Sequence, residues 1–572
     1  MWPFSVTSYP QKSPQELDGE YDYIIVGGGT AGCVLARRLA DDRRCTVLLV
    51  ERGDTRNNFL DRFPLLSTHQ FSGKKHSVVT TARFTADRDT EVIAGKGLGG
   101  TSRINGMQYT RAVPGEFNAW ARAGRKGWSY DEMVPYFQRA ERLWSPVQAP
   151  PNEFFFGCSA QIARAAERIG LANCKDVNDA SLPTSGHYMT HQTVDQSGNR
   201  SSTYRAYLPQ DFALAHKDHL HICTNTIARK VELSRTEDGS LRATGVILQA
   251  TSPGAPSLHV SARKEVILAC GALVTPQILM LSGIGPADHL KSLDVLVIHP
   301  MEGVGANLQD HVGAVFVTQC PLWDSIVALF VNPWSLMYQM LRFLILGDGW
   351  FRYPYMELSI FTKKSFLDQE YGQRALSDEE KDSSRSENIP DIEIMTGAIC
   401  NFHAPGFNQD EGGFCMLPTV LRPASRGTVR LASSDPLDTP LYDFNYLSAP
   451  EDRAVLRAGV RLCMRLTREM RAAGYAAPDF TAPASGSDAD VDAFVAAHGQ
   501  SFFHFASSCR MAPVDDPAGP GVVDDALRVH GVPNLRVCDA SVFPQVPAAH
   551  LQAPVIAVAE KCADMVKETG RC

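Results

Sequence analysis

Three glycines near the start of this 572-residue chain have the spacing of a nucleotide-binding loop. Gly27, Gly29 and Gly32 form the pattern G-x-G-x-x-G directly after the apolar run 23–26. Gly27 permits a tight turn, Gly29 lets the backbone approach a pyrophosphate, and Gly32 lets a helix pack closely on a strand. A helical pattern follows over residues 33–40, and its N-terminus offers free N–H groups and a positive dipole end to phosphates.

An acidic residue completes this pattern. Glu51 ends the second apolar run, 45–50, and stands 19 residues after Gly32, where a ribose hydroxyl needs an acceptor. An acid here disfavours a 2′-phosphate and leaves NAD and FAD both open. A glycine-rich turn without a nucleotide is the less favoured interpretation, because strand, helix and acid are all present.

A second glycine-rich segment follows at residues 95–106, with five glycines among twelve residues, and it includes Thr101 and Ser102. Apolar segments flank it, so we expect a backbone that closely follows a large ligand rather than a flexible linker. Further along, a buried strand at 265–272 leads into a helix at 275–282, and 218–231 with 242–250 suggest a β-meander.

Two helices and one loop complete the expected elements. Helices are predicted from residue 127 to 142 and from 450 to 473, and the polar stretch 372–388 is predicted to be a surface loop without regular order. The length predicts two or three domains. A net charge of −8 and the lack of a basic stripe argue against nucleic acid, and no group of histidines has metal-ligand spacing.

The fourteen cysteines are scattered, without a C-x-x-C pair. Cys45, Cys270, Cys538 and Cys562 lie in apolar runs, which predicts buried free thiols rather than disulfides. Residues 1–5 lack the cationic start and apolar core of a secretory signal, so we expect an intracellular, cytoplasmic protein.

The most apolar stretch, residues 326–346, is interrupted by polar residues and is too mixed for a transmembrane segment. Asn332 and Pro333 are typical of an N-cap and first helical position, which predicts a helix over 333–346. We expect this helix to be buried over a cavity. A membrane surface or a dimer face is the alternative location.

From the second glycine-rich segment onward, the chain resembles the glucose–methanol–choline (GMC) family of FAD-dependent oxidoreductases, above all its aryl-alcohol oxidase and glucose oxidase members. The resemblance covers nearly the whole chain. It is carried by residues 97–102, 105–107, 269–272, 281–286, 304–311, 423–427, 504–511, 522–524 and 535–544, and by His550.

The resemblance implies an α/β protein (α+β overall) with two domains. A Rossmann-like FAD-binding domain would occupy 18–310, completed by 505–572, with substrate-domain insertions near 60–90 and 150–215. The substrate-binding domain would occupy 311–504 and contain an antiparallel six-stranded sheet. The implied FAD is noncovalent, because Asn105 stands where some relatives carry a histidine linked to FAD. The implied cofactor-binding residues are Gly27, Gly29, Thr30, Gly32, Glu51, Gly99, Thr101, Asn105, Gly106, Met107, Ala228, Asp539, Ala540, His550 and Leu551.

By the same resemblance, His504 and His550 are the catalytic pair. Oxidising an alcohol to an aldehyde or ketone requires a hydride acceptor, which is FAD, and a group that takes the hydroxyl proton. An imidazole suits that second role near neutral pH. His504 would be the base and His550 would position the hydroxyl, whereas His311 is expected to be structural.

Aromatic residues favour a hydrophobic or aromatic alcohol as the small-molecule substrate: Phe502, Phe503, Trp334 and Tyr338 are predicted to line its cavity. Oxygen or another electron acceptor would reoxidise the flavin, and the protein would be a monomer or a homodimer. Two alternatives stay open: a lyase or light-driven decarboxylase on the same fold, and a flavin-binding protein without catalysis.

Overall fold

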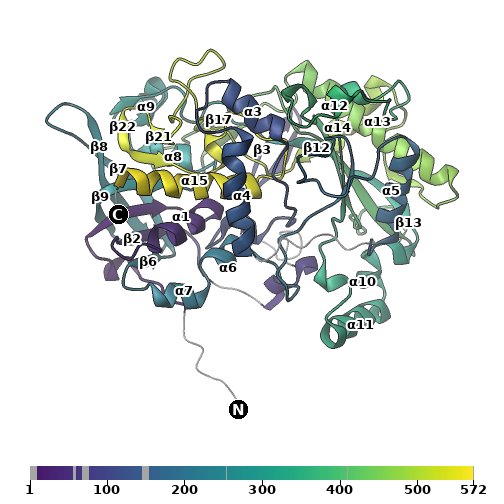
Figure 1. Ribbon diagram of the computed structural model, residues 1–572, viewed down its shortest axis with the longest axis horizontal. Coiled ribbons are helices and arrows are strands. Elements are labelled where there is room, and N and C mark those ends of the chain that lie inside the picture. The colour runs from purple at the N-terminus through teal and green to yellow at the C-terminus, as the bar shows by residue number, and fades with distance from the viewer. Residues whose placement is uncertain are drawn as a thin grey trace.

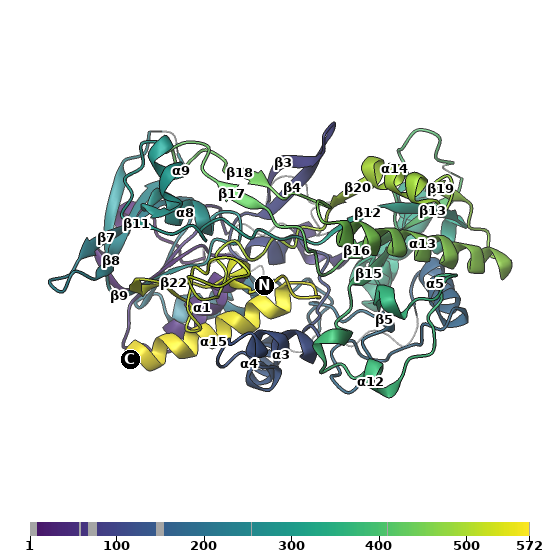
Figure 2. The same cartoon turned by 90° about the horizontal axis from the view of Figure 1, so that it is seen from above.

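The computed structural model describes residues 9–55, 59–66, 77–144, 154–252, 254–408 and 410–570. It contains two large sheets side by side, each with its own helices (Figures 1 and 2). The first sheet carries segments from both ends of the chain, and the second is built mostly from the middle and later part. The predicted α/β class is confirmed. The predicted domain boundaries, including those at 310 and 504, stay a prediction.

The first sheet is organised around β1 (Glu20–Val26), which lies parallel to β2 (Val47–Val50) on one side and to β9 (Ser257–Leu268) on the other. Both faces of a parallel sheet are covered, which explains why β1 and β2 are almost uninterrupted apolar runs. The strand order is β21-β22-β9-β1-β2-β6, with β8 and then β7 attached to β9. The other strands are β6 (Leu220–Cys223), β7 (Thr226–Arg235), β8 (Leu241–Ala250), β21 (Arg528–Val529) and β22 (Val532–Val537). The predicted meander is thus β7-β8-β9, and β6 belongs to the parallel part.

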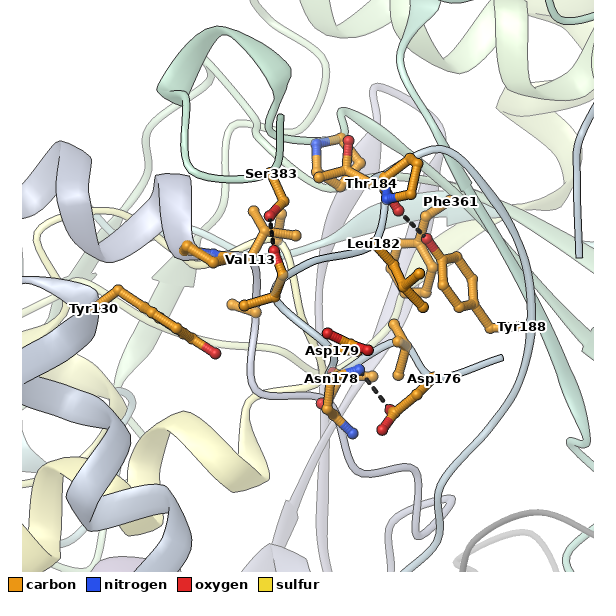
Figure 3. Close-up of a pocket in the computed structure, with 18 residues that line it drawn as sticks. Val113, Tyr130, Asp176, Asn178, Asp179, Leu182, Thr184, Tyr188, Phe361 and Ser383 are labelled. Atoms are coloured by element: carbon orange, nitrogen blue, oxygen red, sulfur yellow. Dashed lines mark hydrogen bonds between the residues drawn. The ribbon is translucent and has the colours of Figure 1, made fainter. Parts of the chain in front are cut away.

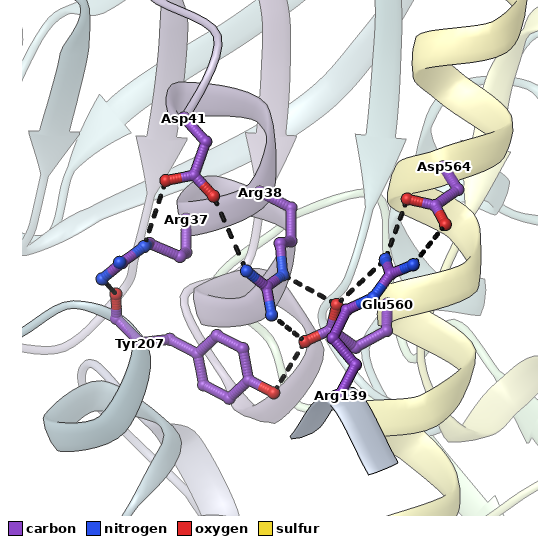
Figure 4. Close-up of polar contacts among 7 residues, drawn as sticks. All are labelled: Arg37, Arg38, Asp41, Arg139, Tyr207, Glu560 and Asp564. Carbon is purple, nitrogen blue, oxygen red and sulfur yellow. Dashed lines mark hydrogen bonds and ion pairs between the residues drawn. The ribbon is translucent and has the colours of Figure 1, made fainter. Parts of the chain in front are cut away.

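A buried carboxylate ties the two ends of the chain together beneath this sheet (Figure 4). Glu560 on α15 (Gln552–Gly570) accepts two hydrogen bonds from Arg38 on α1 (Thr30–Ala40), at 2.7 and 2.8 Å. The Tyr207 hydroxyl donates a third at 2.9 Å. Because the Glu560 side chain is fully buried, its charge depends on these partners for stabilisation.

Among the described residues, the second sheet is antiparallel and has eight strands, so the predicted number of six is wrong. Six strands form the continuous order β19-β13-β16-β15-β14-β5, and β12 and β20 extend it at β16. The two additional strands are short and carry no clear alternation, so the sequence gives little sign of them. The strands are β5 (Gly186–Met189), β12 (Val312–Ala314), β13 (Phe316–Cys320), β14 (Leu358–Thr362), β15 (Ile392–Gly397), β16 (Gly412–Val420), β19 (Asp479–Thr481) and β20 (Gly499–Ser501).

One face of this sheet is covered by helices. Ile392 and Ile394 of β15 pack in one core with apolar residues of α13 (Pro450–Ala472) and α5 (Gly157–Arg168). The remaining longer elements cover the edges and connect the sheets. They are α3 (Pro114–Arg122), α4 (Tyr130–Trp144), α6 (Thr203–Tyr207), α7 (Gln210–Ala215), α8 (Thr275–Leu281), α9 (Ala287–Ser292), α14 (Asp488–His498) and the hairpin β3 (Ser77–Thr85) with β4 (Arg88–Gly95).

Two local expectations are corrected. The stretch 372–388 is ordered, since Ser377 and Glu380 form a capping box at α12 (Asp378–Lys381). Cys45 is disulfide-bonded, whereas the other twelve cysteines of the described part of the chain are free. Spacing along the chain does not reveal which sulfurs lie within bonding distance, so this bond could not be predicted from the cysteine pattern.

The helix predicted at 333–346 exists as α11 (Pro333–Leu341), continued by the π-helical turn η7 (Arg342–Leu346). Its predicted burial over a cavity is wrong, because it projects from the lower edge of the molecule together with α10 (Val327–Val331) (Figure 1). Trp334 is 72% exposed and Tyr338 is 56% exposed. In the described parts of the chain, no helix has the length and apolarity needed to cross a bilayer.

Candidate active site

The first glycine-rich loop has the shape that a phosphate group requires. Gly27 has φ 103°, and a Cβ on Gly32 would lie 1.8 Å from the Gly27 oxygen, so neither position accepts a side chain. A Cβ on Gly29 would meet nothing closer than 3.9 Å, which leaves open space above the start of α1. The N–H groups of Thr30 and the next residues stand at this helix N-terminus, where an anion is favoured.

Glu51 joins the two glycine-rich segments. Its carboxylate accepts hydrogen bonds from the backbone N–H groups of Gly28, Gly53 and Gly97, at 2.8, 2.8 and 3.0 Å. A carboxylate has about four acceptor directions, so one stays available for a ribose hydroxyl. The Gly99 N–H also donates to the Gly28 oxygen at 2.8 Å, which holds the second segment against the first.

The second segment ends at Asn105, which sits in a network of polar groups. Arg200, fully buried with its pKa lowered to about 9 by desolvation, donates to the Asn105 side-chain oxygen at 2.8 Å. The Asn105 amide donates to Gln552. The Gln552 amide nitrogen is buried without a hydrogen-bond partner in the described protein, so it can donate to a polar ligand. Met107 has φ 64°, which bends the backbone directly after Gly106.

The remaining predicted cofactor residues lie on strands and loops on the side of the molecule that contains the first sheet. Asp539 is the N-cap of the short helix η11 (Ala540–Val542) and accepts from the N–H groups of Ser541 and Gly271, both at 2.8 Å. Burial raises the Asp539 pKa. Ala228 is buried on β7, opposite Leu248. Thr101 accepts a hydrogen bond from Gly95 at 3.1 Å, and Leu551 is buried beside His550.

His504 follows β20 at a sharp bend. Its backbone N–H donates to Asp310 at 2.7 Å, and Asp310 also accepts from Ser501 and Tyr446. Phe503 has φ 61°, an unusual conformation for a bulky residue, and its N–H donates to the Ser501 hydroxyl at 2.8 Å. The buried Asp310, whose pKa is raised to about 7 by desolvation, therefore fixes the loop that carries His504.

Two further imidazoles face His504. The Nδ1 atoms of His504 and His311 lie 2.8 Å apart and share a hydrogen bond, and the His504 and His550 rings meet edge to face at 5.2 Å between centroids. Burial, with added repulsion from His311 and His550, holds the His504 pKa well below its usual value. The His311 pKa falls to about 3, chiefly through burial. Both rings are thus neutral at physiological pH.

His550 has a carboxylate partner on the second sheet. Its Nε2 lies 3.0 Å from Oε1 of Glu393, a fully buried residue of β15, and its backbone N–H donates to the Thr110 hydroxyl at 2.8 Å. A histidine held by a carboxylate at one nitrogen has a fixed ring orientation. The His550–Glu393 pair therefore links the segment before α15 to the second sheet, at the point where His504 and His550 meet.

The sheet face that carries Glu393 also carries an apolar cluster. Met395 lies two residues along β15 and pairs with Leu417 of β16, so both point to the same side as Glu393. We call this the cavity cluster: Val317, Val327, Met395, Cys400, Phe407, Cys415 and Leu417, with Val315, Leu322, Val331, Met356, Phe402, Phe480 and Phe502 packed against them. Met356 lies beside Gly106, and Phe502 stands two residues before His504.

The four predicted substrate residues do not come together. Phe502 joins the cavity cluster, whereas Phe503 turns toward a surface pocket lined by Arg88 and Gln500. The left-handed bend at Phe503 separates the two rings. Trp334 and Tyr338 lie on the exposed surface of α11, so their predicted place in a cavity wall does not hold.

Another pocket lies between α4 and the segment 176–184 (Figure 3). Tyr130, Asp179 and Ser383 are among its lining residues, and neither His504 nor His550 is. The two predicted catalytic histidines therefore do not line this pocket, although Thr110, which accepts the His550 N–H, does. The described residues also contain no group of three histidine, cysteine or carboxylate side chains arranged for a metal ion.

Sequence reasoning missed Glu393 and the cavity cluster, and it took His311 for a structural residue. Glu393 alternates with Ile392 and Ile394 in a strand, which predicts that it faces the opposite side of the sheet from these two isoleucines. Nothing in that pattern identifies His550 as its partner. The spacing of Asp310 and His311 shows no link to a histidine almost 200 positions later.

The fold and site define a flavoprotein oxidoreductase of the GMC class. Residues 21–313 and 423–559 match the N-terminal and C-terminal parts of the GMC oxidoreductase family, so the chain belongs to this family. The chain is 34% identical to dehydrogenase str4 of Strobilurus tenacellus, over 98% of this chain and 95% of that protein. It is 33% identical to an oxygen-dependent choline dehydrogenase of Stenotrophomonas maltophilia, over 96% and 95% of the two chains.

Solved structures agree with this assignment. An FAD-dependent oxidoreductase from Chaetomium thermophilum superposes with a TM-score of 0.82 and 25% identity, over 96% of this chain and all of that one. The protein is therefore an FAD-dependent oxidoreductase, as predicted. The open space at Gly29 and the unpaired amide of Gln552 fit this cofactor, because FAD presents both a pyrophosphate and a polar ring system.

Proposed function

We propose that this protein oxidises a hydrophobic or aromatic alcohol to the aldehyde or ketone. The observation that carries the proposal is the group of His504, His550 and Glu393, with the cavity cluster on the same face of the sheet as Glu393. When bound, FAD supplies a hydride acceptor at N5. The side chains of the protein have to hold the alcohol, exclude water and move its hydroxyl proton.

His504 is the general base in this proposal. Its lowered pKa keeps the ring neutral, so a lone pair is available for the hydroxyl proton. The Nδ1 atoms of His311 and His504 share one hydrogen bond, and in this proposal His504 is its donor. Nδ1 of His311 then accepts the hydrogen bond from Nδ1 of His504, which leaves the lone pair of His504 on Nε2. His311 is thus a positioning residue that selects the tautomer.

His550 holds the substrate oxygen in this proposal. Glu393 accepts a hydrogen bond from Nε2 of His550 and orients the ring toward His504. In this proposal the His550 ring carries both of its N–H groups, so that Nε2 donates to Glu393 and Nδ1 donates to the oxygen of the alcohol. The stabilisation from this hydrogen bond grows as negative charge develops on that oxygen, because a donor that is already positioned in a buried site needs no reorganisation.

The substrate class is inferred from the cavity cluster. Met395, Leu417 and Phe502 offer apolar side chains on the sheet face beside His550. Glu393 is engaged by His550, so this carboxylate is not free to pair with a quaternary ammonium substrate such as the choline named for some relatives. An apolar alcohol therefore fits this surface better.

For the cofactor, we propose that Gly27, Gly29, Thr30, Gly32 and Glu51 hold the ADP part, and that Asn105, Gly106 and Met107 lie along the ring system. We propose contact with the cofactor also for the other residues that the sequence analysis named: Gly99, Thr101, Ala228, Asp539, Ala540, His550 and Leu551. Asn105 is no nucleophile toward the flavin and its amide is bound to Gln552, so the FAD is held noncovalently.

An anaerobic absorbance spectrum, recorded before and after addition of a panel of alcohols, tests the proposal. We expect the oxidised flavin band to bleach with an aromatic or long-chain alcohol and not with choline. Readmitting air then separates oxygen from another electron acceptor. A flavin band that no alcohol bleaches would replace this proposal with a lyase or light-driven decarboxylase. If the unbleached flavin is also inactive in lyase and light-driven decarboxylation assays, the protein binds flavin without catalysis.

A further inference from the structure

The segment 326–346 exposes more apolar surface than any other part of the described chain. In the described residues, its side chains make up most of the large hydrophobic groups that face solvent. Ile345 is 73% exposed, Trp334 72% and Leu344 66%. We call this surface the apolar ridge. Its exposed members are Phe330, Trp334, Leu336, Met337, Tyr338, Met340, Leu341, Leu344, Ile345 and Leu346.

The polarity of the ridge is inverted relative to an ordinary surface helix. Ser335 and Gln339, one helical turn apart, are the buried residues of α11, and the Gln339 side chain accepts a hydrogen bond from Trp350 N–H at 3.1 Å. The apolar residues face outward instead. A water-facing helix normally shows the opposite arrangement, so this surface is suited to an apolar surrounding.

The exposed arrangement is built into the chain. The Asn332 side chain accepts from the N–H groups of Trp334 and Ser335, at 2.9 and 3.2 Å, and Pro333 occupies the first helical position. At the other end Gly347 adopts the left-handed conformation, with φ 62°, that stops a helix. The exposed side chains of α11 therefore belong to a helix whose start and end are both set by local residues.

We propose that the apolar ridge inserts into the interfacial layer of a lipid bilayer. From Leu336 through Trp334 to Tyr338, the exposed side chains span about 200° of the helix circumference at 100° per residue. A second copy of the chain would cover one side of such a projecting ridge, whereas lipid surrounds it. The ridge projects from the body of the molecule (Figure 1), which leaves room for this insertion.

The distribution of polar groups supports lipid over a protein partner. Arg342 is the only charged residue within 326–346, and its guanidinium is paired with Asp348. Arg352 donates to the Gly347 oxygen at 2.6 Å, so a second cation stands at the base of the ridge. Trp334 and Tyr338 are the residue types that occupy the boundary between lipid and water. Apolar and aromatic side chains on the outside, with two arginines at the base, suit the interfacial layer of a bilayer.

The ridge is continuous with the cavity cluster. Val327 of α10 belongs to the cluster and Val331 packs against it. Phe330, on the ridge, stacks on Phe402 of the cluster at 5.3 Å between ring centroids. If the proposed oxidation of a hydrophobic alcohol holds, an alcohol dissolved in the bilayer reaches the cluster along apolar side chains. This last consequence rests on the proposed function, whereas lipid binding does not.

Flotation of the purified holoenzyme with phosphatidylcholine vesicles tests the insertion. We expect the protein to float with the vesicles, also at high salt, since the contact is apolar. Leu344→Gln with Ile345→Gln should lower the partition coefficient on the order of 100-fold, because two largely exposed aliphatic side chains no longer favour lipid. The matched control is Leu296→Gln with Leu437→Gln, which changes leucines that are 77% and 60% exposed outside the ridge and should float like the unchanged protein.

Two results would overturn the proposal. The holoenzyme could remain in the soluble fraction with every vesicle composition, or it could be a dimer without lipid that Leu344→Gln with Ile345→Gln converts to a monomer. The second result would assign the ridge to a second copy of the chain. Flotation requires no turnover, so it is decided independently of the proposed oxidation. A water-soluble alcohol should be oxidised equally well by both double variants.

Discussion

Replacing Glu393 by Gln tests whether the carboxylate on the second sheet supports catalysis through His550. The substitution keeps the shape of the side chain and removes its charge. Oε1 of Glu393 lies 3.0 Å from Nε2 of His550, and the side chain is completely buried. Water therefore cannot replace the lost interaction.

The expected effect follows from this geometry. A hydrogen bond that involves a charged group contributes roughly 1.5–3 kcal/mol when it is buried. If the interaction strengthens only as charge develops on the substrate oxygen, its loss lowers the rate constant of flavin reduction roughly 10- to 150-fold. Binding of the alcohol should change less, because the cavity cluster is untouched.

Anaerobic stopped-flow measurement of flavin reduction at saturating alcohol gives this rate constant directly. Glu357→Gln is the matched control, since Glu357 is also buried but accepts hydrogen bonds from the backbone of Phe155 and Phe156. A double-mutant cycle with His550→Asn should be strongly non-additive, because Glu393 acts through His550. A reduction rate within twofold of the unchanged protein, or additive losses in the cycle, would refute the assigned role of Glu393.

Three further predictions follow from the same structure. Asp310, whose pKa is about 7, titrates between pH 8 and 6, so the test of His504 lies below that window. The lowered pKa of His504 keeps the proposed base unprotonated, so the rate of flavin reduction in stopped-flow data should stay constant from pH 6 to 5, where an ordinary imidazole would lose about eightfold. A loss of that size would contradict the assignment. Glu560→Gln leaves Arg38 without its buried counter-charge and should lower the free energy of unfolding by about 3 kcal/mol in urea denaturation. Its control is Asp41→Asn at a partly exposed position, which should lower that free energy by less than about 1 kcal/mol. Equal losses would show that burial of the Arg38–Glu560 pair is unimportant. Phe502→Ala should raise the KM for an aromatic alcohol about tenfold, since it removes apolar contact area from the cavity cluster. Phe503→Ala is its control, and an equal effect of both would show that Phe503 also lines the cavity.

Local patterns in the sequence determined the elements that hold the nucleotide. The glycines at 27, 29 and 32 work within a few residues of one another, and β1, α1 and β2 are each specified by a short run of apolar residues. The capped helix at Asn332 was predictable for the same reason, because an N-cap acts within one turn. Motif order along the chain was also enough to indicate the family and its two histidines.

Only the tertiary structure decided which of these residues meet. His311 and Glu393 reach His504 and His550 across 193 and 157 positions, through a sheet whose register no local pattern encodes. The direction of α11 is a second example. Its apolar residues predicted burial, because burial is the usual consequence of apolarity, but the helix carries its polar stripe, Ser335 and Gln339, against the body of the protein. The sequence by itself determined a flavin-binding oxidoreductase with a histidine pair. The packing of distant segments decided the partners of that pair, the apolar cluster on the sheet face beside it and the exposure of the ridge.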